Sequence, residues 1–520
     1  MSRIMKILLL FTFFFGASEY VRCAEIFAVI PSPFYSHQAT FRPLWRELAR
    51  RGHKITLVTT DLMEDNENIT QIDYHGAYEV FARNNVMTVL KSELNIFKVM
   101  SKMLDAVEDL IRFQFTHPEL VKLLESNRTF DVMMIEFTQP GWPLLSVKFK
   151  CPFVGLSTMD AHPGVHAAVG NAAHPAMYPY VDFGFGEKLT LKERIFSAGL
   201  TVLGMTWSNL IFRPMGNRYV RKYLGEGMPD ITGIHKNASL MFVNANPIFF
   251  SPRPSTPITI NLGGGLHLTH PKELPKDLQK YLDESKDGCI YVSFGTTVNS
   301  AYLSAEQKEV LTSVFKDMAP MRILWKFDEV DIANKPKNVE IRTWVPQQDV
   351  LRHPNVKAFI TQGGLQSMEE AIDSAVPMLG MPFYGDQNNN VNKMETKKFG
   401  LKLLPTEMNK ESLKAALKEL LENPIYKKNI DKLSAISKDQ PMKGLEKAVW
   451  WTEYVLRHGT QHLRSPSADI PLYQYYFLDV IAVVSVCAYV FYKLMKSLIL
   501  TLVLILRKLY NFFIVKRKRD

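Results

Sequence analysis

Short apolar runs alternate with helical patterns near the start of this chain. An apolar run at 26–30 is followed by a helical pattern from about 38 to 51, which ends at Gly52, and by a second apolar run at 55–59. Runs of this length indicate buried strands, and a glycine after a helical pattern is a typical helix end. The pattern therefore predicts a β-α-β unit.

The same alternation continues along much of the remaining chain. A Ser-x-x-Gln capping box at Ser304 predicts the start of a helix between two later apolar runs. Strands that alternate with helices typically form parallel sheets with helices on both faces, so we predict an α/β fold. Further buried strands are expected at 132–135, 153–156, 289–294, 322–327 and 356–361.

The length of 520 residues exceeds what one hydrophobic core usually fills, so two domains are expected. The Pro- and Ser-rich segment 247–257 is our predicted linker. We predict two Rossmann-like domains, at 24–250 and at 258–445. Residues 161–207 are rich in Met and aromatic residues with weak periodicity, which fits either the wall of an apolar pocket or packing helices.

The first residues of the chain have the composition of a secretory signal peptide. Basic Arg3 and Lys6 precede an apolar run at 7–15, and Cys23 ends a short cleavage-site pattern. A membrane anchor is the alternative, but the apolar run is short for a span that needs about 20 residues. We predict a signal peptide at 1–23.

A membrane-spanning helix is predicted at 471–495. Asp479 is its only charged residue ahead of two lysines near its end, and the basic residues that follow argue against the alternative of a buried core helix. We expect an amphipathic connecting helix at 446–470 and a basic cytoplasmic tail at 496–520. Within that tail, the apolar run 497–506 is too short to span and is expected to lie along the cytoplasmic face.

Most of the net charge of +10 lies at the C-terminal end. Residues 493–520 hold eight Lys or Arg and one Asp, which leaves about +3 for the rest of the chain. By the positive-inside rule, this distribution places the large domains in the lumen. We therefore interpret the basic balance as membrane topology and expect no nucleic-acid binding.

Sequons and cysteines agree with a lumenal position. Sequons begin at Asn68, Asn127 and Asn237 and are compatible with glycosylation. Cys151 and Cys289 lie beside apolar strands, and we interpret both as buried thiols.

The segment 344–387 combines features suited to binding a nucleotide diphosphate sugar. A strand runs into Gln362-Gly363-Gly364, and a helix is expected to start near Gln366. Backbone N–H groups and the positive end of the helix dipole would meet at this point. We expect it to attract phosphate.

An ordered set of residues around this turn resembles the signature of the UDP-glycosyltransferase family. The signature is W-x-P-Q, a Gly-Gly turn, E-A and then D-Q. It matches here at Trp344, Pro346, Gln347, Gly363, Gly364, Glu370, Ala371, Asp386 and Gln387. Each residue alone has a structural explanation, such as core packing or helix capping, which their joint spacing argues against. The resemblance spans nearly the whole chain and implies the GT-B architecture, in which two Rossmann-like domains face each other.

The resemblance implies roles for individual residues of a donor site. Trp344 would stack on uracil, Gln347 would contact the base, and Glu370 would hold the ribose hydroxyls. Asp386 and Gln387 would bind the sugar.

Some donor-site positions depart from the family pattern. The family usually has His before the Gly-Gly turn, where this chain has Gln362, whose amide can donate to phosphate but carries no charge. Gln366 and Ser367 stand where the family commonly has Asn and a small residue, and both can donate to the diphosphate. Thr296, after the Gly295 turn, is a weaker donor-site candidate.

His37 is the candidate general base. Alone it would more often be structural, but its segment P-x-x-x-S-H-Q resembles the general-base loop of the family. A base is needed because an alcohol or phenol is a poor nucleophile until its proton is removed. In the family an Asp holds this His, and the matching position here is Glu136, five residues after Asp131. We expect Glu136 to fill that role with a shifted backbone.

The resemblance therefore implies an inverting transfer of a sugar from a UDP-sugar to a hydroxyl of a small lipophilic acceptor, as in detoxification. We favour glucose, because the sequence GGLQS is closer to that of invertebrate members of the family, in which glucose is usual. Glucuronate is the alternative. No D-x-D pair is present, so we expect no metal and no cofactor besides the UDP-sugar co-substrate. A dinucleotide-dependent oxidoreductase is poorly supported, because the second domain does not open on G-x-G-x-x-G.

The expected location is the endoplasmic reticulum membrane, as a single-pass type I protein with lumenal domains. A homo-oligomer stays an open alternative. A competing interpretation is a non-catalytic membrane protein that binds UDP or lipophiles, which the departures at Glu136 and Gln362 would permit. A lipid receptor with a signalling tail is a third, but 516–520 is too short to be a domain.

Overall fold

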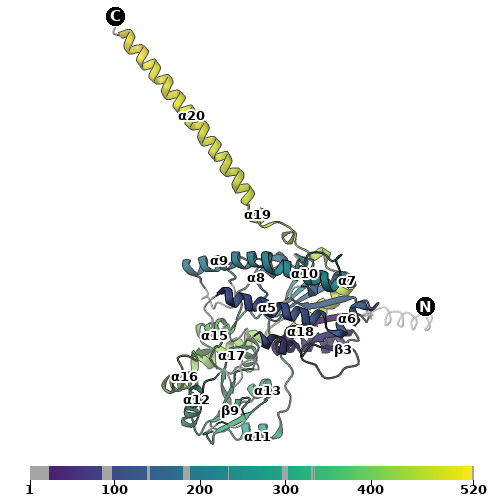
Figure 1. Ribbon diagram of the computed structural model, residues 1–520. Helices are drawn as coiled ribbons and strands as arrows, with labels where there is room; N and C mark the ends of the chain where they lie inside the picture. The colour runs from purple at the N-terminus through teal and green to yellow at the C-terminus, as the bar shows by residue number, and fades with distance from the viewer. Residues whose placement is uncertain are drawn as a thin grey trace, which may run out of the picture. The chain divides into compact units, whose positions relative to one another are not determined.

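Two parallel sheets carry the fold (Figure 1). The chain divides into one unit at Met1–Arg464, which holds both sheets, and a second unit at Ser465–Asp520. The computed structural model describes residues 23–84, 96–137, 141–179, 188–231, 233–295, 303–329, 332 and 334–517. Apart from Cys23, the predicted signal peptide lies outside these residues, as does Thr296.

The first sheet has seven strands in the order β3-β2-β1-β4-β5-β6-β7. Chain order reverses between the neighbouring strands β1 and β4, and ligands of α/β proteins bind at the carboxyl ends of such strands. The strands are β1 (Glu25–Ile30), β2 (Lys54–Thr59), β3 (Ile69–Asp73), β4 (Val132–Glu136), β5 (Phe153–Ser157), β6 (Leu240–Val243) and β7 (Thr259–Asn261). The helices of this part are α2 (Tyr35–Arg50), α3 (Ala77–Arg83), α5 (Ile96–Phe115), α6 (Pro118–Glu125), α7 (Leu145–Phe149), α8 (Pro163–Ala168), α9 (Leu191–Trp207) and α10 (Arg213–Leu224), with the shorter turns η1 (Trp142–Leu144), η3 (Ser208–Phe212) and η4 (Ile234–Asn237).

The second sheet has six strands in the order β10-β9-β8-β11-β12-β13 and reverses chain order between β8 and β11. The strands are β8 (Cys289–Ser293), β9 (Arg322–Lys326), β10 (Val339–Arg342), β11 (Val356–Thr361), β12 (Met378–Gly380) and β13 (Gly400–Lys402). The helices are α11 (Lys276–Asp283), α12 (Ala305–Asp317), α13 (Gln347–Leu351), α14 (Leu365–Asp373), α15 (Gln387–Thr396), α16 (Lys410–Glu422), α17 (Pro424–Lys438) and α18 (Gly444–His458), followed by η6 (Gln461–Leu463). The predicted α/β fold with two Rossmann-like domains is confirmed.

Both faces of the first sheet are buried, which explains why its strands are continuous apolar runs in the sequence. In β1, Ile26 and Ala28 face one hydrophobic core, whereas Phe27 and Val29 face another. The first of these cores also contains residues of the second domain, such as Phe359. The two domains therefore share one hydrophobic core.

The structure differs from two predictions, namely the position of the linker and the length of the connecting helix. Strand β7 pairs with β6, so the segment 247–257 connects two strands of the first sheet, and that domain continues to Asn261. A three-residue strand is too short to detect from its pattern. The helix expected at 446–470 ends at His458, and its Glu453 contacts Arg51 of the first domain at 3.1 Å. Helix α18 therefore packs on the first domain.

The second unit contains η7 (Pro466–Ala468), α19 (Leu472–Tyr475) and the long helix α20 (Leu478–Arg517). Figure 1 shows α20 as one unbroken helix. The run 497–506, expected as a separate segment, is therefore part of the same helix, because the lysines before it do not interrupt helical geometry. By length and composition, Leu478–Ile514 is apolar enough to cross a membrane.

The two cysteines that were predicted as buried thiols differ in burial. Cys289 is fully buried, as predicted, whereas Cys151 is half-buried, and both are free thiols.

Candidate active site

The carboxyl edge of the first sheet brings His37 and Glu136 together. His37 lies in the first turn of α2, directly after β1, and Glu136 is the last residue of the neighbouring β4. The Nδ1 atom of His37 makes a short contact with Oε1 of Glu136. The other carboxylate oxygen accepts a hydrogen bond of 2.6 Å from the Ser32 hydroxyl. The predicted partner of His37 is therefore in contact with it, despite its extra methylene.

The electrostatics of this pair suit a base. Glu136 is fully buried, while the His37 side chain keeps 19% of its surface exposed. Burial lowers the pKa of His37, but its ion pair with Glu136 and the charge of Asp386 outweigh that effect, so the pKa is raised. With Nδ1 facing the carboxylate, Nε2 is the nitrogen that can accept a proton. Asp386 belongs to the second domain, so charged groups of both domains influence His37.

Gln38 braces the loop that carries the base. Its Nε2 donates to the carbonyl oxygens of Ile30 at 2.9 Å and Ser32 at 3.1 Å. Its Oε1 accepts from the Thr59 hydroxyl at 2.8 Å. These bonds join the ends of β1 and β2 to the first turn of α2, which limits the freedom of the neighbouring His37.

The expected phosphate site lies between β11 and α14. The helix begins at Leu365, one residue before the predicted start, and Gly364 at its N-cap has no side chain to cover the first N–H groups. Gly363 takes a positive φ of 83°. Gln362 is buried, and its Oε1 accepts a hydrogen bond of 3.1 Å from the Thr361 hydroxyl. The geometry is that of an uncapped helix start that can receive an anion.

Gln366 joins the two domains at this point. Its amide nitrogen donates to the carbonyl oxygen of Ser36 and, at 2.5 Å, to the hydroxyl of Thr40. Both acceptors lie on α2, beside His37. The amide expected to face the diphosphate is thus engaged across the domains, and its role toward the donor stays a prediction.

The predicted base and ribose contacts form one network. Gln347 Nε2 donates to Ser367 Oγ at 3.0 Å and to Glu370 Oε2 at 2.6 Å. Gln348 Nε2 donates to Glu370 Oε1 at 3.1 Å. Each carboxylate oxygen has a second lone pair, so Glu370 can still accept from ribose hydroxyls.

The remaining predicted donor residues flank this network. Trp344 leaves 69% of its surface exposed, as a stacking platform requires. Asp386 stands at the N-cap position of α15, and the Oε1 of Gln387 accepts from two backbone N–H groups of the preceding turn at 2.8 and 3.1 Å. Asn390 Nδ2 donates to Asp386 at 2.7 Å and to the carbonyl oxygen of Gly363 at 3.1 Å. It therefore connects the predicted sugar side with the phosphate turn.

Comparison with known proteins identifies the family of the chain. A family model described as "UDP-glucoronosyl and UDP-glucosyl transferase" matches residues 27–511. The chain belongs to this family. It is therefore a UDP-glycosyltransferase, an enzyme that moves a sugar from a UDP-sugar to an acceptor. The non-catalytic interpretation is not retained.

Relatives of this UDP-glycosyltransferase cover nearly its whole length. "UDP-glycosyltransferase UGT5" from Dactylopius coccus is 30% identical over 94% of this chain and 96% of its own. "Ecdysteroid UDP-glucosyltransferase" from Spodoptera littoralis nuclear polyhedrosis virus is 32% identical over 88% and 93%. "UDP-glucuronosyltransferase 2B14" from Oryctolagus cuniculus is 31% identical over 87% and 88%.

Solved structures identify the architecture as GT-B. The glycotransferase of kitacinnamycin aligns with a TM-score of 0.59 at 17% identity, over 83% of this chain and 99% of its own. The spinosyn forosaminyltransferase SpnP aligns with a TM-score of 0.54 at 14% identity, over 84% and 99%. At this identity the likeness concerns the fold alone.

Sequence reasoning missed a buried acid–base cluster behind the donor site of the UDP-glycosyltransferase. The His267 ring lies 3.4 Å from Glu370 and 3.8 Å from Glu369, which also accepts from the Gly265 N–H at 3.1 Å. Burial raises the pKa of Glu369 to about 7. Burial lowers the pKa of His267, but Glu370 and Glu369 outweigh it, so the pKa is raised. The available signal was the glycine run just before His267.

This cluster does not form a metal site. Within the described ranges, no group of three or more His, Cys, Asp and Glu side chains could hold a metal ion. We infer instead that His267 orients Glu370 toward the position expected for ribose.

The turn before α14 tolerates only glycine at position 363. We expect Gly363→Ala to destabilise the UDP-glycosyltransferase by roughly 2–5 kcal/mol, because a positive φ costs about 1–2 kcal/mol and overpacking about 1–3 kcal/mol. The new Cβ would lie 2.3 Å from the Val391 side chain. Gly459→Ala is the control, with a φ of 63° and open space around its Cβ. Melting temperatures should fall further for Gly363→Ala, and equal shifts would contradict the packing argument.

Proposed function

We propose that this enzyme transfers glucose from UDP-glucose to a hydroxyl group of a small lipophilic acceptor, with inversion at the anomeric carbon. The observation that carries the proposal is the His37–Glu136 pair, whose charge state is influenced by Asp386 of the second domain. The hydrogen bonds from Gln366 to Ser36 and Thr40 support the proposal as well, because they hold the start of α14 beside the helix that carries His37.

The reaction would be a single displacement. The acceptor oxygen forms a bond to the anomeric carbon while Nε2 of His37 takes its proton, and the bond from that carbon to the diphosphate oxygen breaks. Buried Glu136 stabilises the imidazolium that forms. UDP leaves with its charge toward the N–H groups that open α14, and no metal or cofactor takes part in the proposed step. One displacement inverts the configuration.

Glucose is favoured by the polar groups of the predicted sugar side. Asp386 and the amide of Gln387 suit the hydroxyl groups of a neutral sugar, and no cationic residue adjoins them in the sequence to pair with the carboxylate of glucuronate. The viral relative named as a glucosyltransferase agrees with this preference.

The proposed location is the endoplasmic reticulum membrane. The apolar helix α20 would cross the bilayer, with the basic end of the chain in the cytosol and both domains in the lumen. Lipophilic acceptors concentrate in such membranes.

A donor panel tests the sugar preference. Microsomes that contain the full chain are supplied with a phenolic acceptor and with UDP-glucose, UDP-glucuronate, UDP-galactose or UDP-N-acetylglucosamine. We expect kcat/KM for UDP-glucose to exceed that for UDP-glucuronate by at least ~10-fold, which corresponds to about 1.4 kcal/mol. Equal or higher values with UDP-glucuronate would reject glucose as the preferred sugar. Microsomes that contain the Gly459→Ala enzyme serve as the control for activity, because Gly459 lies outside the predicted donor and catalytic residues.

A further inference from the structure

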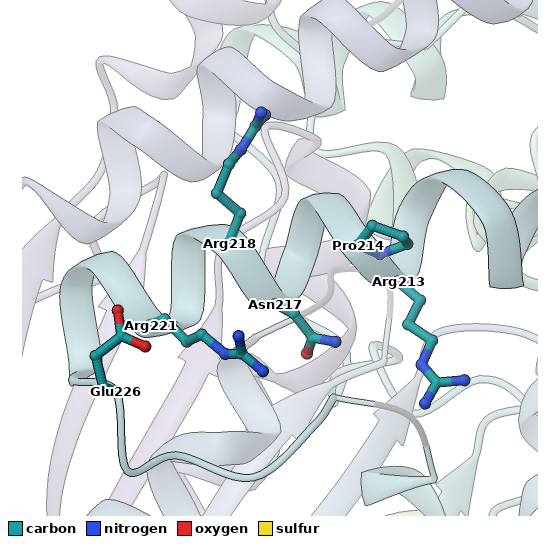
Figure 2. Close-up of a pocket in the computed structure, with 6 residues that line it drawn as sticks. All are labelled: Arg213, Pro214, Asn217, Arg218, Arg221 and Glu226. Atoms are coloured by element: carbon teal, nitrogen blue, oxygen red, sulfur yellow. The ribbon is translucent and has the colours of Figure 1, made fainter.

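Charged side chains outside the predicted donor and catalytic residues gather on α10 and behind the donor site. On α10 they line a cavity of ≈ 630 Å³ (Figure 2), where Arg213 forms an ion pair of 3.1 Å with Asp230 that is exposed to solvent. Behind the donor site, His267 and Glu369 are buried. Buried charges act on their neighbours more strongly than exposed pairs do, so the buried group has the larger influence.

The connection between the two sheets passes directly over α14. It leaves β7 at Asn261 and reaches α11 at Lys276, so residues 262–275 form the interdomain linker. Within this linker, Gly264 has a positive φ of 81°, and a Cβ atom added to it would lie 2.4 Å from Oε1 of Glu369. The linker therefore fits against α14 only because this position has no side chain.

Glu369 is the acidic side chain that faces the linker from α14. Only 1% of its side-chain surface is exposed. Its Oε2 accepts a hydrogen bond of 3.1 Å from the N–H of Gly265 and lies 3.8 Å from Nδ1 of His267, while its Oε1 has no hydrogen-bond partner within the described part of the chain. An ionisable group at this depth is costly, and an apolar side chain would fill the position without that cost. Glu369 therefore has a role other than packing.

His267 lies between Glu369 and Glu370. Its Nε2 lies 3.4 Å from Oε1 of Glu370, and only 3% of its side chain is exposed. Burial lowers the pKa of His267, but Glu370 and Glu369 raise it by more, which favours the imidazolium form with a proton on each nitrogen. The amides of Gln347 and Gln348 reach Glu370 from α13 at 2.6 and 3.1 Å, so His267 supplies the contact from the linker side.

We propose that Glu369 and His267 are positioning residues for the nucleotide: Glu369 fixes the interdomain linker and His267, and His267 in turn holds Glu370, the carboxylate expected to receive the ribose hydroxyls. Both residues stand outside the family signature from which the donor site was predicted. The inference rests on the proposed function only in taking UDP as the nucleotide of the donor, whichever sugar that donor carries.

Binding of UDP and of 2′-deoxy-UDP tests the proposal without any sugar. The full chain is purified in detergent, and both dissociation constants are measured by isothermal titration calorimetry. Wild-type enzyme should prefer UDP, because 2′-deoxy-UDP lacks a hydroxyl that Glu370 is expected to receive. Glu369→Leu should reduce this preference at least ~5-fold, by weakening the binding of UDP with little effect on 2′-deoxy-UDP. Equal affinity of the wild type for the two nucleotides would overturn the proposal and leave the donor panel unaffected.

Asp373→Asn is the matched control on the same helix. Asp373 pairs with Arg352 at 3.7 Å and with Lys438 at 3.5 Å, away from the predicted donor residues, so its replacement should leave the preference for UDP unchanged. A Glu369→Leu enzyme with a lowered melting temperature but the wild-type preference for UDP would have lost a structural contact alone, and the proposal would be overturned. If leucine prevents folding, Glu369→Gln keeps the shape of the side chain and gives the same test.

A double-mutant cycle tests whether Glu369 acts through His267. His267→Leu and Glu369→Leu should each lower the preference for UDP, and the double variant should lower it no further than His267→Leu alone. Additive losses would show two independent effects and overturn the proposal. The double variant replaces both buried polar groups with apolar ones, so we expect it to be more stable than either single variant.

Discussion

Replacing His37 with alanine is expected to lower kcat for sugar transfer by about 10³-fold, within the range of 10²–10⁴ that a general base typically contributes. The reason is the position of the His37 ring. The ring stands on the first turn of α2, with Nδ1 against buried Glu136 and Nε2 left to take a proton. Alanine leaves the acceptor hydroxyl protonated as it attacks, while the donor network around Glu370 is untouched.

The measurement is an initial-rate assay together with UDP binding, read as a shift in melting temperature. UDP should bind the His37→Ala enzyme as tightly as it binds the wild type. His270→Ala is the matched control, because His270 is exposed and lies outside the predicted catalytic pair. If His37→Ala enzyme retained near-normal kcat, the base would have to be another group.

Replacing Glu136 with glutamine is expected to reduce kcat by about 100-fold or more, because the amide keeps the shape of the side chain but removes the charge that stabilises the imidazolium. The change should also move the pH profile. Burial lowers the pKa of His37 and Glu136 raises it, with the net effect upward. Since His37 must be neutral to accept a proton, activity falls as pH drops through the pKa of this group.

Without the carboxylate, the lowering effect of burial remains, so the acid limb of kcat/KM should shift to lower pH in Glu136→Gln enzyme. Glu136→Asp keeps the charge and should preserve the acid limb better than glutamine does. A structural role alone would lower stability and leave the position of the limb unchanged. An unmoved limb in Glu136→Gln enzyme, or full activity, would reject the assignment.

The agreement between prediction and structure is greatest where the signal is local. Strand β11, the glycine turn and α14 form one continuous run, so their order in sequence already brings N–H groups and a helix start together. The same holds for His37, which directly follows a strand, since ligands of α/β sheets bind at carboxyl ends.

Contacts between distant residues were not predictable in this way. Gln366 was expected to face the diphosphate, but it reaches Ser36, 330 residues away. The sequence around Glu369 on α14 has no pattern that marks this residue as functional. Only the tertiary structure brings His267 and Gly265 into contact with it.

The sequence by itself determined the alternation of strands and helices, the glycine turn between β11 and α14 and the apolar C-terminal helix, because each depends on periodicity or spacing over a few residues. The predicted pairing of His37 with Glu136, 99 residues away, came from the resemblance to the family and not from a local pattern. Tertiary structure decided that β7 completes the first sheet, that α18 returns to α2 through Glu453 and Arg51, and that α9 leaves its apolar face exposed. Strand pairing, contacts between domains and burial are properties of chain segments packed together, and their partners lie too far apart in sequence for a local pattern to record them.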